Sequence, residues 1–231
     1  TDGSFFVNIK EHCEDGQRNL YVKELTIAHV RDWGWMFVDE YAWVHGGTPK
    51  GVVNRFKNGW EPIFQFTRGS HKFRPDAVRH ESDSVVDWGG KHPSQMDGHG
   101  LKRGEGVGGN QGYGDGVGAR ARDAITEGLA YPSNVLSVGK NREALGHGAA
   151  YPVGLPSFFI KAYSDAGDTV YDPFTGSGST LISAEKHGRK FRGIEISASY
   201  CDLIIRRFQD FTGETATLDG DGRTFADVKT E

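Results

Sequence analysis

Apolar positions along the chain fall into short runs that predict strands and helices. Mixed β-branched and aromatic runs, typical of strands, cover Ser4–Ile9, Trp35–Val44 and Glu61–Thr67. Residues 18–31 repeat apolar side chains at helical spacing. In the last third, the expected elements are helix 155–166, strand Thr169–Asp172, helix Ser179–His187, strand Lys190–Ile196 and helix Tyr200–Phe211. This alternation predicts an α/β fold with a mostly parallel sheet and helices on both faces.

Between the N-terminal strands and the elements of the last third, the apolar pattern stops. From Trp88 to Gly118, glycines recur with few apolar side chains, so the stretch cannot offset its own ordering entropy. We therefore expect a long mobile loop there. The expected organisation is a first sheet half (1–87), a Gly-rich insert (88–130), a second α/β half (131–213) and an acidic tail (214–231).

Composition and charge exclude several classes of protein. With 231 residues, 36% apolar and 25% charged, the chain is typical of a soluble globular domain with room for a small insert. No apolar run reaches the roughly 18–20 residues that span a bilayer, and no signal-peptide pattern is present, so a cytoplasmic location is expected. The net charge of −4 argues mildly against nucleic acid, yet residues 50–79 are strongly basic. Because the charge is distributed unevenly, the net charge does not exclude DNA as a partner.

The strongest chemical signal is a glycine-rich turn between an expected strand and an expected helix. It reads Asp172, Pro173, Phe174, Thr175, Gly176, Ser177, Gly178, Ser179 and Thr180. Its glycines permit backbone conformations that a Cβ would block, and Ser179 and Thr180 are candidates to cap the helix. Glu195 stands at the end of the next strand, where nucleotide-type folds place an acid on ribose hydroxyls. No Lys follows the glycines, which excludes a phosphate P-loop, and a dinucleotide fingerprint is not completed.

These residues resemble a known family. The turn is similar to the S-adenosylmethionine-binding motif I of the β-class (permuted) DNA amino-methyltransferases of phage or restriction-modification type, and residues 192–195 resemble motif II. Residues 147–156 resemble motif X, and Ser133-Asn134-Val135-Leu136 matches a segment that often precedes it. The resemblance implies a class I methyltransferase (Rossmann-like) fold and S-adenosylmethionine as cofactor. Besides the turn and Glu195, it implies four further cofactor-binding residues: His147, Ala149, Tyr151 and Pro152.

The catalytic motif of that family is not found in this chain. The motif reads Asp/Asn/Ser-Pro-Pro-aromatic and holds the target amine while an aromatic ring stacks on the flipped base. No Pro-Pro pair occurs, so the catalytic residues are unknown. In relatives the motif lies upstream of the strand that resembles Ser4–Ile9. We expect it in a missing N-terminal segment or a separate chain, and a degenerate protein is the other alternative.

The implied substrate is double-stranded DNA, methylated on an exocyclic amine in the cytoplasm of a bacterial or phage-infected cell. N6-adenine is favoured because it is the commoner product in the class, with N4-cytosine as the alternative. Candidate phosphate contacts are Arg55, Lys57, Arg68, Lys72 and Arg74, and the Gly-rich insert is a candidate target-recognition loop.

Two rival functions remain: an RNA or protein methyltransferase, and a cofactor-binding but non-catalytic remnant that binds DNA. No metal is expected, because the histidines at 71, 80, 92 and 99 match no standard zinc spacing. Trp33, Trp35 and Trp43 alternate along an expected strand and are interpreted as core residues.

Overall fold

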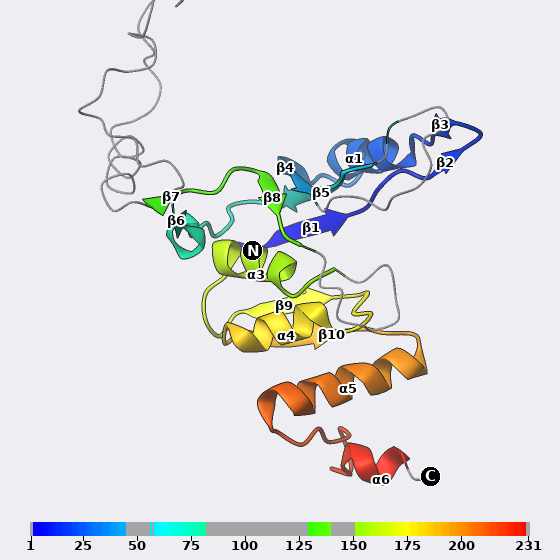
Figure 1. The fold of residues 1–231 in the computed structure, drawn as a ribbon, viewed down its shortest axis with the longest axis vertical. Helices are drawn as coiled ribbons and strands as arrows, with labels where there is room; N and C mark the ends of the chain where they lie inside the picture. Colours follow the sequence, from blue (N-terminus) through cyan, green and yellow to red (C-terminus); the bar gives the residue numbers. More distant parts are fainter. Residues whose placement is uncertain (1, 45–55, 57, 82–128, 140–150, 230–231) are drawn as a thin grey trace, which may run out of the picture. The chain divides into compact units, whose positions relative to one another are not determined.

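A computed structural model describes residues 2–44, 56, 58–81, 129–139 and 151–229 (Figure 1). The chain divides into two compact units. The larger contains Thr1–Ala77 and Ser133–Glu231, and the smaller contains Val78–Pro132. Most residues of the two expected halves, 1–87 and 131–213, belong to the larger unit. The glycine-rich stretch at 88–118 lies outside the described residues.

The N-terminal part of the larger unit supplies a four-stranded sheet and one helix. The sheet contains β1 (Ser4–Asn8), β4 (Met36–Val44) and β5 (Trp60–Thr67), with β8 (Val135–Ser137) added later in the chain, and the helix is α1 (Tyr21–Arg31). Between β1 and α1, β2 (Cys13–Glu14) and β3 (Gln17–Arg18) form a separate antiparallel pair. The strand order is β1-β5-β4-β8. β5 runs antiparallel to both β1 and β4, whereas β4 and β8 are parallel. The sheet in this half is therefore mixed, with β8 the strand that pairs in parallel with β4.

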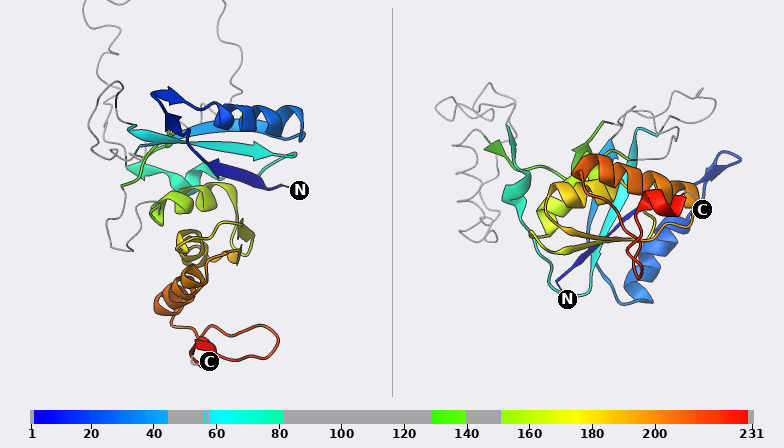
Figure 2. Two further views of the ribbon diagram at one scale, coloured as in Figure 1. Left: turned by 90° about the vertical axis from the view of Figure 1, so that its right-hand side faces the viewer. Right: turned by 90° about the horizontal axis from the view of Figure 1, so that it is seen from below.

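Two apolar layers cover the opposite faces of this sheet, because side chains alternate along each strand. On one face Phe64 and Phe66 pack with the fully buried Val22 of α1. On the other face Ile63 joins a cluster formed by Tyr41, Trp43, Leu136, Leu155 and Phe159. Figure 2 shows α1 on one side of the sheet and α3 (Gly154–Tyr163) on the other. This arrangement gives the helices on both faces that the sequence predicted.

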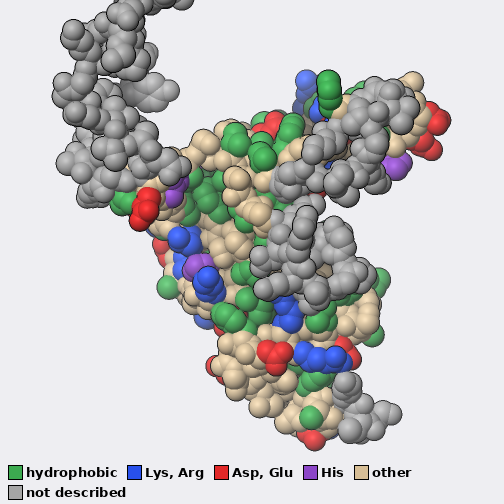
Figure 3. Space-filling model, viewed as in Figure 1, with side chains coloured by type: hydrophobic (Ala, Val, Ile, Leu, Met, Phe, Trp, Pro, Cys, Tyr) green, Lys and Arg blue, Asp and Glu red, His purple; other side chains and the backbone are tan. Residues whose placement is uncertain are grey.

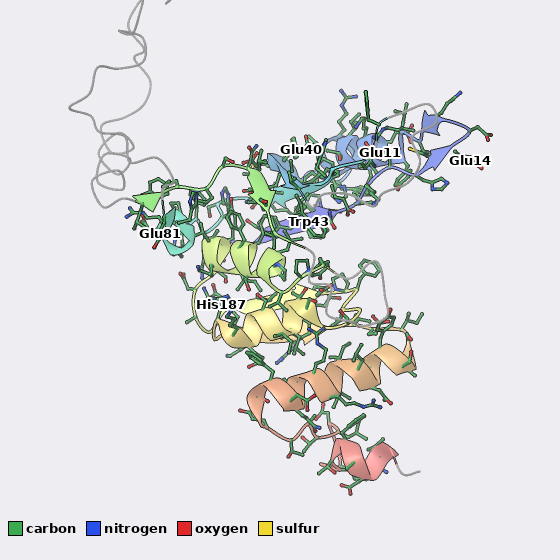
Figure 4. The ribbon with its side chains drawn as sticks, in the orientation of Figure 1. Glu11, Glu14, Glu40, Trp43, Glu81 and His187 are labelled. Carbon is green, nitrogen blue, oxygen red and sulfur yellow. The ribbon has the colours of Figure 1, made fainter. Side chains whose placement is uncertain are left out.

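Trp43 anchors the second layer. It is 3% exposed, and its indole Nε1 donates to the carbonyl oxygen of Val138 at 2.9 Å (Figure 4). Trp33, in contrast, is 49% exposed, and Trp35 is half-buried beneath Arg68. The interpretation of all three tryptophans as core is thus correct for Trp43 and wrong for Trp33. The reason is that β4 begins at Met36, so Trp33 precedes the strand that would have placed it in the core.

The C-terminal part alternates strand and helix as expected. It contains β9 (Thr169–Asp172), α4 (Ser179–Lys186), β10 (Lys190–Gly193), α5 (Ala198–Thr212) and α6 (Phe225–Lys229). β9 and β10 pair in parallel, with Asp172 opposite Gly193. The tail from 214 also contains an isolated bridge between Thr217 and Thr224. The α/β class is confirmed.

The smaller unit has few described residues. η1 (Pro75–Val78) leads into it, and β6 (His80–Glu81) pairs antiparallel with β7 (Leu129–Ala130). Beside this pair, the Arg79 guanidinium lies 4.8 Å from the centre of the Tyr131 ring and donates to its hydroxyl at 2.7 Å. The two ends of the insert are therefore tied together. The sequence pattern did not predict this short ladder.

Candidate cofactor site

The loop between β9 and α4 has the backbone that its glycines suggested. Gly176 and Gly178 adopt positive φ angles of 54° and 83°, which residues with a Cβ rarely adopt. Between them, the Gly178 N–H donates to the carbonyl oxygen of Thr175 at 2.9 Å. The loop is thus a tight turn whose glycines are required by conformation.

Glu195 closes this loop from the segment just after β10, because that strand ends at Gly193 and does not reach Ile196 as expected. Its Oε2 accepts the Gly176 N–H at 2.8 Å and its Oε1 accepts the Ser197 N–H at 2.9 Å. The backbone N–H of Ser197, and then those of Gly176 and Ile196, hold the pKa of the Glu195 carboxyl below its usual value. Glu195 is therefore an anionic acceptor at neutral pH, with lone pairs left for hydroxyl donors.

Asp172, at the end of β9, is held by a hydrogen-bond network. Its Oδ2 accepts the Thr180 hydroxyl at 2.6 Å and the Tyr151 hydroxyl at 3.2 Å, and its Oδ1 accepts the Phe174 N–H at 2.9 Å. Burial, followed by the charge of Asp172, raises the pKa of Tyr151 to about 12, so the phenol keeps its proton. The structure thus joins Tyr151 of the motif X segment to the first and last residues of the glycine-rich turn.

Ser179 and Thr180 do not cap α4. The N-cap residue is Gly178 in a left-handed conformation, and no side chain caps the helix. The Ser179 hydroxyl donates to the carbonyl oxygen of Tyr151 at 2.9 Å, while Thr180 bonds Asp172. The capping expectation is wrong because both side chains are buried within the first turn and are used for tertiary contacts.

Most side chains of the loop point inward, and two apolar ones do not. Thr175, Ser177, Ser179 and Thr180 are each at most 8% exposed, whereas Phe174 is 86% exposed. Ile196, next to Glu195, is 99% exposed. Large apolar side chains that stand free beside an anionic acceptor are suited to an aromatic ring carried on a hydroxylated sugar.

A close approach that the sequence analysis missed lies at Gly193, the last residue of β10. A Cβ there would lie 2.3 Å from the Thr175 Oγ1 and 2.6 Å from the ring of Phe191. Thr175 is fixed by two bonds, from its N–H to Ile194 O at 3.0 Å and from its hydroxyl to Asp172 O at 3.1 Å. A glycine inside a strand run was the available signal, because it often marks such a contact.

The other expected cofactor residues are only partly described. Pro152 is buried, and its carbonyl oxygen accepts the N–H of Leu155 at the start of α3. Pro173 is half-buried beside Phe174. His147 and Ala149 lie outside the described residues.

Three of the expected DNA contacts lie among the described residues, and two of them pair with acidic residues just before the amino end of β9. The Lys72 ammonium contacts Asp168 Oδ2 at 2.6 Å, and Asp168 precedes β9, about 13 Å in chain length before Asp172. Arg74 makes a bidentate pair with Asp165, with both distances 3.0 Å. Arg68 follows Thr67, which pairs with the first residue of β1, and its guanidinium lies 4.7 Å from the centre of the Trp35 ring.

Acidic and basic side chains are interspersed on the described part of the face in Figure 3.

Arg55 and Lys57 lie outside the described residues. The strands before and after this segment meet where Val44, the last residue of β4, pairs with Trp60, the first residue of β5.

No group of three or more His, Cys, Asp or Glu residues suited to a metal occurs within the described ranges. His187, at the end of α4 (Figure 4), has a buried Nε2 without a partner in the described part of the chain, and burial lowers its pKa. The His187 ring is therefore neutral at neutral pH. No helix among the described residues is long and apolar enough to cross a membrane.

A glycine-rich turn after one parallel strand, with an acid after its neighbour, defines a Rossmann-like nucleotide-type fold of the class I methyltransferase kind. The family model for DNA methylases of the N6/N4 type matches residues 1–206, so the chain belongs to that family.

Two solved structures and one curated protein illustrate the similarity. The PvuII DNA methyltransferase (cytosine-N4-specific) superposes with a TM-score of 0.61 and 20% identity, over 95% of this chain and 65% of that one. The M1.HpyAVI–SAM complex superposes with a TM-score of 0.53 and 16% identity, over 89% of this chain and 74% of that one. The DNA adenine methyltransferase YhdJ of Escherichia coli K12 is 38% identical over 80 residues, which are 33% of this chain and 27% of YhdJ.

The sequence similarity to curated proteins is confined to part of their length. Aligned segments cover 30% of the orphan methyltransferase M.BamHII of Bacillus amyloliquefaciens and 27% of YhdJ. The chain therefore spans less than a third of these relatives in sequence alignment.

Proposed function

We propose that this chain is the cofactor-binding part of a DNA amino-methyltransferase, which transfers a methyl group from S-adenosylmethionine to an exocyclic amine of a DNA base. The observation that carries the proposal is the contact between the Glu195 carboxylate and the Gly176 N–H. It brings together the two segments that resemble motifs I and II, and family membership supports the same conclusion.

The residues present fit that cofactor. The anionic Glu195 can accept hydrogen bonds from the ribose hydroxyls, and the exposed Phe174 and Ile196 can offer apolar surface to the adenine ring. Asp172, held by Tyr151 and Thr180, is proposed to contact the methionine part of the cofactor. When bound, the cofactor supplies an activated methyl group, and the role of these residues is to bind and orient it.

The catalytic motif is proposed to enter between the two sheets. Within the described residues, β1 pairs only with β5, and β9 only with β10. The starts of β1 and β9 are joined through Lys72, whose ammonium lies 3.9 Å from Asp2 and 2.6 Å from Asp168. The unpaired edges of β1 and β9 can therefore accept one additional strand between them, since neighbouring strands lie about 4.8 Å apart. We assign that place to a strand that carries the Pro-Pro motif, from a further segment or a separate chain.

Methyl-transfer assays test this assignment. The 231-residue chain alone should transfer little or no methyl group to DNA, and added polypeptide carrying the motif should restore transfer. Robust transfer by the chain alone would show that another group holds the amine. The same assay with RNA in place of DNA separates the DNA enzyme from an RNA methyltransferase.

We propose N6-adenine as the target base, with N4-cytosine as a second candidate. Similarity to YhdJ, named as an adenine enzyme, supports the first. Similarity to the cytosine-N4-specific PvuII enzyme, together with the Ser133-Asn134-x-Leu136 segment, supports the second. Nucleoside mass analysis of DNA methylated by the complete protein distinguishes them, and N4-methylcytosine without N6-methyladenine would overturn the adenine proposal.

For DNA contact we favour Arg55 and Lys57. The strands on either side of them end at Val44 of β4 and begin at Trp60 of β5, and these two residues pair at the carboxyl end of β4. Lys72 and Arg74 already pair with carboxylates, so they are weaker candidates. The Gly-rich insert stays a proposed recognition loop.

A further inference from the structure

Helix α5 packs directly against the glycine loop. A Cβ at Gly178 would lie 3.4 Å from the Ile204 Cγ1 and 3.7 Å from its Cγ2. Ile204 and Arg207 are three residues apart on α5 and therefore share a face of the helix. The same face thus presents an aliphatic side chain and a guanidinium to the loop backbone.

Arg207 makes one contact of particular interest. Its Nη1 donates to the carbonyl oxygen of Ser177, a residue that is only 8% exposed. Arg207 is half-buried, and desolvation lowers its pKa. Within the described ranges, no carboxylate lies within ion-pairing distance of it. The adjacent Arg206 differs, since it is exposed and pairs with Asp202 at 3.3 Å.

The Ser177 carbonyl and the Gly178 N–H belong to one peptide group, and both of them make a hydrogen bond. The N–H donates to Thr175 O at 2.9 Å, and the carbonyl accepts from Arg207. Gly178 tolerates either sign of φ, so the sequence alone would allow this plane to rotate. Rotation would exchange the carbonyl and the N–H between the α5 side and the opposite side of the loop. The contact with Arg207 selects one of the two orientations.

We propose that Arg207 is a positioning residue that locks the Ser177–Gly178 peptide plane in the orientation that the cofactor requires. The inference rests on the proposed cofactor site and concerns a residue outside the motif segments. Arg207 acts through the loop backbone and does not touch the cofactor.

The test compares substitutions at two adjacent arginines. Arg207→Met keeps the aliphatic stem and removes the donors, Arg207→Lys keeps a charged donor, and Arg206→Met is the matched control. S-adenosylmethionine affinity is measured by calorimetry, and exchange of the Gly178 amide is followed by NMR. We expect about tenfold weaker binding and faster Gly178 exchange in Arg207→Met, the scale of a lost hydrogen bond from a charged group. Arg207→Lys should recover most of both, and Arg206→Met should match the wild type.

The possible results separate this inference from the proposed function. If the wild-type protein does not bind S-adenosylmethionine, the cofactor assignment fails, and Gly178 exchange still decides whether Arg207 locks the plane. Wild-type affinity and unchanged Gly178 exchange in Arg207→Met overturn the inference. Equal losses in Arg207→Met and Arg207→Lys also overturn it, because they indicate general destabilisation. Should Arg207→Met fail to fold, Arg207→Gln, which keeps one neutral donor, takes its place with the same expected direction.

Discussion

The close approach at Gly193 gives a sharp test of how the site is built. In Gly193→Ala the new Cβ would lie 2.3 Å from the Thr175 Oγ1, and ordinary contact begins near 3.4 Å, so one of the two must move by about 1 Å. The φ angle of Gly193 is not in the left-handed region, so the cost is steric and does not come from backbone strain. Because Thr175 is buried and held by two hydrogen bonds, its displacement would also shift the loop between β9 and α4.

The expected loss of stability follows from the close contact between the new Cβ and Thr175. Overpacking of this kind costs about 1–3 kcal/mol of unfolding free energy. We expect that loss in urea denaturation, together with about tenfold weaker S-adenosylmethionine binding in calorimetry. Gly3→Ala is the control, because no atom lies within 4 Å of a Cβ there.

A double variant isolates the responsible contact. Thr175→Ala removes the Oγ1, so Gly193→Ala should cost less in that background, with a coupling of about 0.5–3 kcal/mol. Additive effects of the two substitutions would mean that Thr175 is not the obstacle. Wild-type stability and affinity in Gly193→Ala itself would refute the close approach.

Four further predictions concern single groups. Glu195→Ala should weaken S-adenosylmethionine binding roughly tenfold, and unchanged affinity in calorimetry would remove Glu195 from the site. Tyr151→Phe should cost about 1–3 kcal/mol in denaturant unfolding, since the half-buried Asp172 carboxylate loses a donor, and an unaltered midpoint would contradict the network. The pKa of Asp168 is lowered in the folded state, so the stability it contributes is complete above its ordinary pKa and is lost as the pH falls through the folded pKa. Asp168→Asn should therefore make the free energy of unfolding fall less steeply with decreasing pH in the acid range. An equally steep fall would count against this contribution. Charge reversal at Arg55 and Lys57 should reduce the slope of log affinity for DNA against log salt by up to about two units, whereas an unaltered slope would place the DNA face elsewhere.

The sequence by itself determined many local elements and the conformation of the glycine-rich turn. The predicted strand Thr169–Asp172 agrees with β9 residue for residue, because a short apolar run between a glycine and a turn leaves little freedom in its ends. The positive φ angles of Gly176 and Gly178 were also implied, since few other residues adopt them. The acid after the next strand was placed correctly beside that turn because parallel neighbours end at the same edge.

Only the tertiary structure decided which side chains serve each other. Strand direction in the first half depends on long-range pairing, so the antiparallel β5 was not visible in a pattern of apolar positions. Ser179 and Thr180 satisfy a capping rule in sequence, yet they lie buried against Tyr151 and Asp172, and tertiary bonds replaced the local ones. Lys72 illustrates the same limit: its charge suggested a phosphate contact, but the fold surrounds it with carboxylates that are distant in sequence. Residue type sets what a group can do, and long-range packing decides which partner it meets.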